Sequence, residues 1–316
     1  MTDQLGFEGR VAVLTGAGRG VGRAYALALA ERGARVVVND LGCSLVGEGS
    51  DPGPASAVAA EIVAAGGEAV ANHADVTAED GAASIVEQAL ERFGRLDVVV
   101  NNAGNMGPEP IEQLGAKGLR SHLDVHAVGA LNVTRAAWPH LVEARYGRVV
   151  VTTSIGLFGG PFIAAYSAAK GAAFSLGRSL ALAGAEHGVL VNLLAPVAET
   201  RMVTDPELRA RVNLPPLAPG FAPDPVRGAE SVVPMLLVLA HESCPSNGET
   251  YVAGLGRFAR IFTAETTGLI DPGIQPEQLL GRWDEVVDES GYTVEMATAD
   301  SVAFRERLVA EAGGDG

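Results

Sequence analysis

The sequence predicts an α/β protein with a doubly wound parallel sheet, helices on both faces and a C-terminal extension. Three observations predict this fold. Short Val-rich apolar runs recur along the chain, and amphipathic stretches of helical length lie between most of them. A third is composition: 40 of the 316 residues are glycine and 5% are aromatic, which favours tight turns and close helix–strand contacts over an aromatic-rich sandwich.

Seven segments are expected to be strands, because strands buried on both faces of a parallel sheet read as continuous apolar runs. Each is bounded by Gly, Asn or Asp, and together they cover residues 10–16, 34–40, 68–76, 96–104, 147–154, 189–196 and 249–254. Helical patterns at 22–33, 55–67 and 79–94 connect the first four strands. Right-handed crossovers of this kind produce a parallel sheet.

Two segments interrupt this alternation. Residues 41–54 form a Gly/Pro-rich loop after the second predicted strand, and residues 201–227 form a proline-rich segment between the sixth and seventh. The latter is expected near the carboxyl ends of the strands, where ligands bind in such sheets.

The domain organisation follows from where the alternation ends. Residues 1–255 are predicted to form one dinucleotide-binding and catalytic domain. Residues 256–316 are less regular and are predicted to be an extension packed on the same domain, with helices at 275–290 and 301–312.

Charge and cysteine content exclude several classes of function. With 23 basic and 38 acidic residues the net charge is −15, which disfavours binding to nucleic acids and to anionic membranes. Two cysteines without metal-ligand spacing predict neither a disulfide scaffold nor a metal site. The N-terminus lacks a basic segment followed by an apolar run, so we expect no signal peptide and a cytoplasmic location.

A glycine-rich turn, TGAGRGVG, follows the first predicted strand directly. Glycine permits positive φ and close approach of the backbone to a pyrophosphate, and the next helix would offer free N–H groups to the anion. A simple strand–helix turn would look the same, but an acidic residue ends the next predicted strand. The residues assigned to the cofactor here are Gly16, Gly18, Arg19, Gly20, Val21 and Gly22.

That acidic residue, Asp40, predicts the choice of cofactor. Its carboxylate can accept hydrogen bonds from the adenosine ribose and would repel a 2′-phosphate, so NAD is expected rather than NADP. Arg19 and Arg23 act in the opposite direction, since either could bind a phosphate. The alternative role for Asp40 is a solvated turn residue.

Polar turns also follow the third and fourth predicted strands. We expect them where the adenine and its ribose would lie, which adds Asp75, Val76, Asn102, Ala103 and Gly104 to the cofactor site. The amides of Asn101 and Asn102 could instead tie neighbouring strand ends together, and both roles stay open.

A third set of residues carries the chemistry. Ser154 ends the fifth predicted strand, twelve residues before Tyr166 in the segment YSAAK. On a helix, Tyr166 and Lys170 are one turn apart, and a nearby ammonium favours the phenolate. Tyr166 could then exchange a proton with a substrate oxygen that Ser154 holds, while Lys170 could also bind the nicotinamide ribose. The alternative is a Tyr/Lys pair on a helix surface.

Together, TGAGRGVG, Asp40, NNAG, Ser154 and YSAAK resemble the short-chain dehydrogenase/reductase family over roughly residues 6–255. The resemblance implies a Rossmann-type domain that binds a nicotinamide cofactor. It also implies a centre of Ser154, Tyr166 and Lys170 that interconverts an alcohol and a ketone.

A narrower resemblance concerns the substrate. VVVNDLG, DVHAVGALNVTRAAWPHL, YGRVV and LAHESCPSNGETYVAGLG are similar to the (3R)-hydroxyacyl-CoA dehydrogenase part of peroxisomal multifunctional enzymes of type 2 and to bacterial stand-alone relatives. This implies NAD and a 3-hydroxyacyl-CoA thioester, with a steroid or terpenoid alcohol as the alternative. The acidic chain would need local arginines for the CoA phosphates, for which the candidates are Arg201, Arg209, Arg211 and Arg257.

The chain departs from the family pattern in three places. His126 stands where the family usually has an asparagine that supports a water relay to the lysine, so it is a candidate catalytic residue or else a buried structural histidine. The spacing from Ser154 to Tyr166 is one residue shorter than usual, which leaves Thr153 at the family distance. We prefer Ser154 because glycines in the following loop can absorb the deletion. That loop, IGLFGGPFIAA, is apolar and indicates an apolar substrate.

Two further expectations concern partners and function class. The stretch 164–185 is dense in small residues, and the resemblance makes it an oligomer contact, so a homodimer or homotetramer is expected; packing against the sheet is the alternative. A non-catalytic NAD-binding sensor would need the glycine-rich turn but not Ser154, Tyr166 and Lys170, so an enzyme is favoured.

Overall fold

The computed structural model describes residues 4–218, 221 and 226–313. The chain divides into two compact units, Met1–Arg260 and Ile261–Gly316. The first unit contains everything assigned above to the cofactor and to the chemistry. Within the described residues, no helix has both the length and the apolar character that crossing a bilayer requires.

An eight-stranded sheet in the order β3-β2-β1-β4-β5-β6-β7-β8 forms the centre of the first unit. Strands β1 to β7 pair in parallel, and the strand order reverses between β1 and β4. This confirms the predicted doubly wound sheet. The strands are β1 Val11–Leu14, β2 Arg35–Asn39, β3 Glu68–Asn72, β4 Val98–Asn101, β5 Gly147–Thr152, β6 Val189–Pro196, β7 Thr250–Gly254 and β8 Arg257–Ile261.

Strand β8 was not predicted. It follows β7 after only Leu255 and Gly256, which have φ of 55° and 72°. A two-residue connection permits antiparallel pairing only, and positive φ at both positions is typical of a tight hairpin turn. The sequence RFARI has no apolar run, because an edge strand has few buried side chains.

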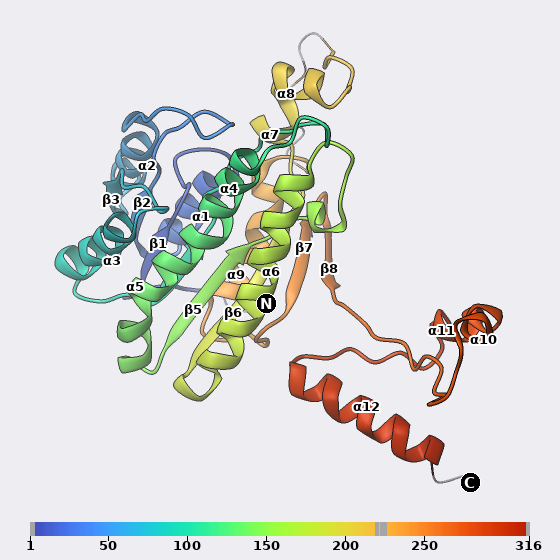
Figure 1. The fold of residues 1–316 in the computed structure, drawn as a ribbon. Helices are drawn as coiled ribbons and strands as arrows, with labels where there is room; N and C mark the ends of the chain where they lie inside the picture. The colour runs from blue at the N-terminus through green and yellow to red at the C-terminus, as the bar shows by residue number, and fades with distance from the viewer. Residues whose placement is uncertain (1–3, 219–220, 222–225, 314–316) are drawn as a thin grey trace. The chain divides into compact units, whose positions relative to one another are not determined.

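Helices lie on both sides of the sheet (Figure 1), and a hydrophobic cluster fills each of the two interfaces. Alternate strand residues, such as Ala12 and Val13, belong to opposite clusters, because successive side chains of a strand point to opposite faces. One face packs on α1 Gly20–Glu31, α2 Gly53–Ala64 and α9 Val233–Ala240. The other packs on α3 Glu79–Phe93, α5 Gly129–Glu143 and α6 Ala164–Gly184.

Between β4 and α5 the chain forms α4 Ala116–Leu123, which continues into a π-helical turn over Asp124–Val128. A short 3₁₀ turn over Ile155–Phe158 follows β5. The segment 201–227 begins with two short helices, α7 Arg201–Thr204 and α8 Pro206–Arg211. Part of that segment, residues 219, 220 and 222–225, lies outside the described residues.

The second unit contains α10 Pro276–Gly281, α11 Trp283–Val286 and α12 Thr298–Gly313. The final predicted helix, 301–312, is confirmed as α12. The prediction of one helix over 275–290 is wrong, since α10 ends at Gly281 and α11 is a separate turn. Glycine is a weak helix former, and Gly281 is the last residue of α10. The packing of the extension on the first unit stays a prediction.

Candidate active site

The glycine-rich turn lies between β1 and α1 and has a shape that side chains would disrupt. Gly16 has φ of 60°, and a Cβ there would lie 2.7 Å from Ala103 Cα. A Cβ on Gly22 would overlap the Gly16 carbonyl oxygen. The N-cap residue of α1, Arg19, makes no side-chain capping bond, so no cap competes with an anion for the first N–H groups of the helix. These features fit a bound pyrophosphate.

Asp40 directly follows β2 and lies against this turn, as predicted. Its two carboxylate oxygens accept hydrogen bonds from Gly18 N–H at 2.8 Å and Gly42 N–H at 2.7 Å. Each oxygen still has a lone pair for a ribose hydroxyl. Asp40 is therefore a fixed, buried carboxylate and not a solvated turn residue.

The two arginines that could favour a 2′-phosphate have other partners. Arg19 donates to the Cys43 carbonyl at 3.3 Å. Arg23 Nη2 donates to both carboxylate oxygens of Glu61, at 2.7 and 2.8 Å. Arg201 of α7 is a third cation in this region. Burial and the neighbouring charge of Arg19 lower the pKa of Arg201, and the carboxylate of Asp40 opposes this shift only in part.

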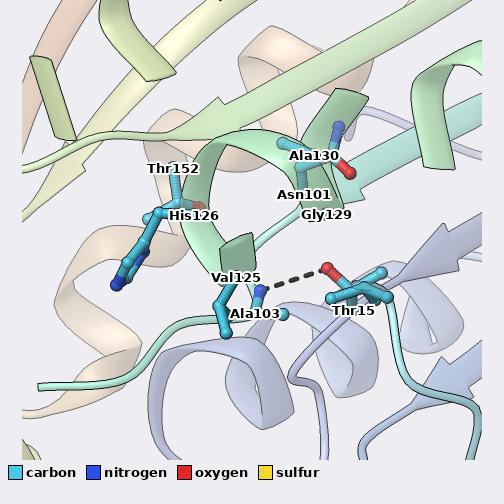
Figure 2. Close-up of a pocket in the computed structure, with 9 residues that line it drawn as sticks. Thr15, Asn101, Ala103, Val125, His126, Gly129, Ala130 and Thr152 are labelled. Carbon is cyan, nitrogen blue, oxygen red and sulfur yellow. Dashed lines mark hydrogen bonds between the residues drawn. The ribbon is translucent and has the colours of Figure 1, made fainter. Parts of the chain in front are cut away.

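The NNAG turn after β4 ties two strand ends together. The Asn102 side chain donates to the carbonyls of Thr15 at 3.1 Å and Gly16 at 2.9 Å. The Thr15 hydroxyl accepts the N–H groups of Asn102 and Ala103, each at 3.1 Å, and Figure 2 shows the second of these bonds. The turn thus has the structural role that the sequence left open. The role of Thr15 in holding this turn was not predicted, because a single threonine before a glycine is not a recognisable sequence motif.

The turn after β3 holds the remaining cofactor candidates, Asp75 and Val76. The Asp75 carboxylate accepts the Thr77 N–H at 2.9 Å, and Val76 is buried. Strand β3 ends at Asn72, earlier than predicted, so both residues lie in a loop at the carboxyl edge of the sheet. Their contact with an adenine or its ribose stays a prediction.

Ser154 and Tyr166 meet at the end of β5 and the first turn of α6. The two side chains share a hydrogen bond that lowers the pKa of Tyr166, and the Ser154 hydroxyl also accepts the Gly156 N–H at 3.0 Å. The Thr153 hydroxyl donates instead to the Lys170 carbonyl at 3.2 Å. A Cβ on Gly156 would lie 2.8 Å from Tyr166 Cε1. The loop glycine therefore allows the short spacing and brings Ser154 to the tyrosine.

Burial controls the electrostatics of Tyr166 and Lys170. Burial raises the pKa of Tyr166, with the Ser154 hydrogen bond opposing it. Burial lowers the pKa of Lys170 from 10.5 to about 7, while its Nζ donates to the Thr152 carbonyl at 2.7 Å. The expected fall in the Tyr166 pKa beside a lysine ammonium is therefore wrong for this structure. The lysine is itself desolvated, and its Nζ is bonded to the backbone.

His126 lies in the π-helical turn, with its ring edge-on to that of Tyr166 and the two centroids 5.3 Å apart. Burial lowers its pKa well below the usual value, so the ring is neutral. His122 stacks on it at 6.3 Å and accepts the Gly107 N–H at 3.1 Å. His122 was not predicted, although two histidines one helical turn apart are a signal that the sequence offers.

The comparisons with known proteins agree with this geometry. The family described as short chain dehydrogenase matches residues 10–209. A short-chain type dehydrogenase/reductase of Mycobacterium tuberculosis is 42% identical over 90% of this chain and 96% of its own length. Peroxisomal multifunctional enzyme type 2 of Mus musculus is 37% identical over 98% of this chain, which spans only 42% of that protein.

A solved structure shows the same fold. The 7α-hydroxysteroid dehydrogenase complexed with NADH and 7-oxoglycochenodeoxycholic acid has a TM-score of 0.68 and 25% identity, covering 81% of this chain and 98% of its own. The chain therefore belongs to the short-chain dehydrogenase/reductase family, whose members are oxidoreductases that act on CH–OH groups with NAD or NADP.

Proposed function

We propose that this chain is an NAD-dependent dehydrogenase that interconverts a 3-hydroxyacyl-CoA thioester and its 3-keto form. One observation carries the proposal: Ser154 hydrogen-bonds the buried Tyr166, which lies beside the buried Lys170, at the carboxyl edge of the sheet that also holds the glycine-rich turn. A binding module or sensor has no need of a phenol hydrogen-bonded to a hydroxyl beside a buried lysine.

The nicotinamide cofactor, when bound, exchanges hydride with the carbinol carbon. The backbone of Gly16 to Gly22 and the first turn of α1 would hold its pyrophosphate, and Asp40 its adenosine ribose. The buried carboxylate of Asp40 and the engagement of Arg19 and Arg23 with other groups support NAD over NADP.

Tyr166 is proposed as the general acid/base. Its raised pKa keeps the phenol protonated at neutral pH, which suits donation to a carbonyl oxygen in the reducing direction. In the oxidising direction the phenol must first lose its proton, and the hydrogen bond with Ser154 favours that loss. Ser154 would also hold the substrate oxygen.

The surface beside Ser154 supports an apolar substrate. Ile155 and Phe158 are 47% and 70% exposed in the turn directly after it. Exposed apolar groups next to a polar reactive centre fit an acyl chain or another apolar body. The similarity to peroxisomal multifunctional enzyme type 2 along nearly the whole chain supports the thioester class.

The arginines predicted to meet CoA phosphates differ in availability. Arg209 donates to the Pro215 carbonyl at 2.7 and 3.0 Å, and Arg211 pairs with Glu207 at 2.7 Å. Both are thus engaged within their own segment. Arg201 and Arg257, both exposed, are the candidates that we retain for a phosphate.

A steroid or terpenoid alcohol is the second candidate substrate, favoured by the likeness to 7α-hydroxysteroid dehydrogenase and by the same apolar surface. The test is an assay of the purified protein with NAD and NADP against 3-hydroxyacyl-CoA esters of both configurations and against steroid and terpenoid alcohols. We expect the absorbance of the reduced cofactor to increase when (3R)-hydroxyacyl-CoA and NAD are supplied together. Turnover of free alcohols alone would select the second candidate, and NAD binding without any turnover would favour a sensor.

We also propose that the chain forms a homodimer or homotetramer through the outer faces of α5 and α6. Leu131 of α5 and Leu182 of α6 are exposed apolar side chains on these helices, and exposed apolar groups of this kind support self-association. A cytoplasmic location and the absence of nucleic-acid and membrane partners stay predictions from the sequence.

A further inference from the structure

The loop between β2 and α2 forms an arm that reaches towards the segment preceding α4 (Figure 1). We call residues 41–51 the strap. Its neck is closed by the Asp51 N–H, which donates to the Leu41 carbonyl at 3.0 Å. Its tip is bonded to itself, because the Ser44 N–H donates to the Glu48 carbonyl at 2.8 Å and the Glu48 N–H to the Ser44 hydroxyl at 3.1 Å. The strap is therefore a compact unit that can move as one piece about its neck.

The tip of the strap rests on the residues that follow β4. The Met106 N–H donates to the Leu45 carbonyl at 2.7 Å. A Cβ on Gly47 would lie 3.1 Å from Asn105 Nδ2, so the tip also touches this side chain. The Asn105 carbonyl oxygen lies 2.9 Å from His126 Nε2, and the His126 ring packs edge-on against the proposed general acid/base. The strap thus ends beside the wall of the proposed active site.

The strap follows the path that the nicotinamide cofactor must take. That path begins at Asp40, which would bind the adenosine ribose, and ends at Tyr166 and Lys170. In the sheet β1 lies between β2 and β4, so a chain that runs from the end of β2 to the residues after β4 crosses the end of β1. The glycine-rich turn lies there, and Arg19 of that turn donates to the Cys43 carbonyl of the strap at 3.3 Å.

The strap meets this turn through a side chain and leaves its backbone uncovered. The contact is made by Arg19 Nη1, at the far end of a long side chain. A Cβ on Gly20 would have only the Thr200 side chain within 4 Å among the neighbours that the structure describes. A diphosphate on the first N–H groups of α1 therefore has room between the turn and the strap.

We propose that the strap is a gate for the nicotinamide cofactor: it crosses above the diphosphate and must swing about its neck before the cofactor can enter or leave. The proposal rests on the proposed cofactor site. Gly42 of the neck has φ of 77°, and a Cβ there would overlap the Asp51 carbonyl oxygen, so the neck requires glycine. Ser44 and residues 47–51 are exposed, so opening needs only local separation of the tip from its neighbours.

A gate of this kind has a kinetic signature. The strap controls access, so a change in how often it opens multiplies the association and dissociation rate constants for NAD by the same factor. The Kd for NAD, which is the ratio of the two rate constants, then stays nearly unchanged. Damage to the cofactor contacts themselves would instead raise the Kd.

A disulfide across the tip tests the gate by locking it. A Cβ on Gly107 would lie 3.9 Å from Val46 Cγ1, so V46C and G107C place two thiols within reach of a bridge. The background carries C43S and C244S, which remove the two native thiols. Stopped-flow fluorescence with NAD measures both rate constants before and after reduction with dithiothreitol.

In the bridged protein both rate constants should be at least about tenfold lower than in the same protein after reduction. The Kd should agree within about threefold between the two forms. V46C alone, in the same background, should not respond to the reductant. Rate constants that stay the same when the bridge is reduced would overturn the gate.

Two glycines of the strap provide the opposite test, in which the tip is loosened. Gly47 and Gly49 have φ of 86° and 78°, so alanine strains the backbone to a similar degree at both. Only the Cβ of G47A meets Asn105, because a Cβ on Gly49 would have no heavy atom within 4 Å among the described neighbours. G47A should raise both rate constants by about fivefold or more over G49A, which corresponds to the lower range of overpacking effects.

Equal rate constants in G47A and G49A would also overturn the gate, and this pair decides the question if thiol titration shows that the bridge does not form. A wild type that binds neither NAD nor NADP would refute the proposed function and the gate with it. A wild type that binds NAD at rates insensitive to the bridge and to G47A would overturn the gate alone.

Discussion

The protonation states that Tyr166 and Lys170 can adopt follow from how deeply both side chains are buried. A phenol with a raised pKa stays neutral at neutral pH, and a lysine with a pKa of about 7 is then protonated in about half of the molecules. Ser154 is the polar group that hydrogen-bonds the phenol. The proposed chemistry therefore depends on one proton that moves between Tyr166 and the substrate.

Replacing Tyr166 with phenylalanine removes only the phenol oxygen. Because general acid–base catalysis contributes about 10²–10⁴-fold, Y166F should lower kcat by at least about 100-fold with the substrate found in the assay above. The Kd for NAD, measured by fluorescence titration, should change little. Turnover equal to that of the wild type would refute the role of Tyr166.

Lys170 should make stability depend on pH. Its pKa falls from 10.5 in the unfolded chain to about 7 in the folded protein, so between these values the unfolded state binds more protons. The free energy of unfolding should accordingly rise as pH increases from 7 towards 10. K170M should reduce that slope in urea unfolding experiments at pH 7, 8 and 9, and an identical slope in K170M would contradict the assignment.

For single residues, motif and spacing select candidate site residues but do not reveal how deeply those residues are buried. Ser154, Tyr166, Lys170 and Asp40 were predicted from motif and spacing. In the structure Ser154 hydrogen-bonds Tyr166, and Lys170 Nζ lies 5.7 Å from the centroid of the Tyr166 ring. The direction of the Tyr166 pKa shift was missed because periodicity does not reveal how far a side chain is removed from water.

At the scale of elements, the site depends on turns that follow strands. The first five strands end before their predicted limits, because Gly, Asn and Asp after the first four, and Ser154 after the fifth, form turns. Parallel apolar strands could be predicted since their buried faces leave a continuous Val-rich pattern. Strand β8 and the break between α10 and α11 could not, since edge pairing and a helix end at Gly281 leave no such pattern.

Gly104 shows how closely one turn approaches its neighbouring helix. A Cβ at this position would lie 2.5 Å from His126 Cε1, so the imidazole or the turn must move. G104A should lower the free energy of unfolding by about 1–3 kcal/mol, as overpacking does, and should lower kcat as His126 shifts against Tyr166. The measurements are urea unfolding and the NAD-linked assay.

The matched control is G115A. Gly115 is the N-cap residue of α4, and a Cβ there would have no heavy atom within 4 Å among the neighbours described. Its free energy of unfolding should stay within about 0.5 kcal/mol of the wild type. Equal effects of the two substitutions would show that the contact with His126 is unimportant.

At the scale of the whole molecule, charge and exposed apolar area have opposite effects on association. A net charge of −15 makes copies of the chain repel one another at long range. Exposed leucines on α5 and α6 nevertheless favour contact at short range, on the face of the sheet opposite α2. Since the repulsion is screened by salt, an oligomer held by apolar contact should persist or strengthen as salt increases.

Leu182 provides the test of that association. It is 55% exposed on α6, and Val63 is equally exposed, at 55%, on α2 of the other face. An aspartate at the centre of an apolar interface would be buried without a partner, which is strongly unfavourable. In sedimentation experiments L182D should shift the dimer or tetramer towards monomer, whereas V63D, which adds the same charge outside the proposed contact, should not. Equal shifts in both variants would assign the effect to charge, and a wild type that sediments as a monomer would remove the proposed interface altogether.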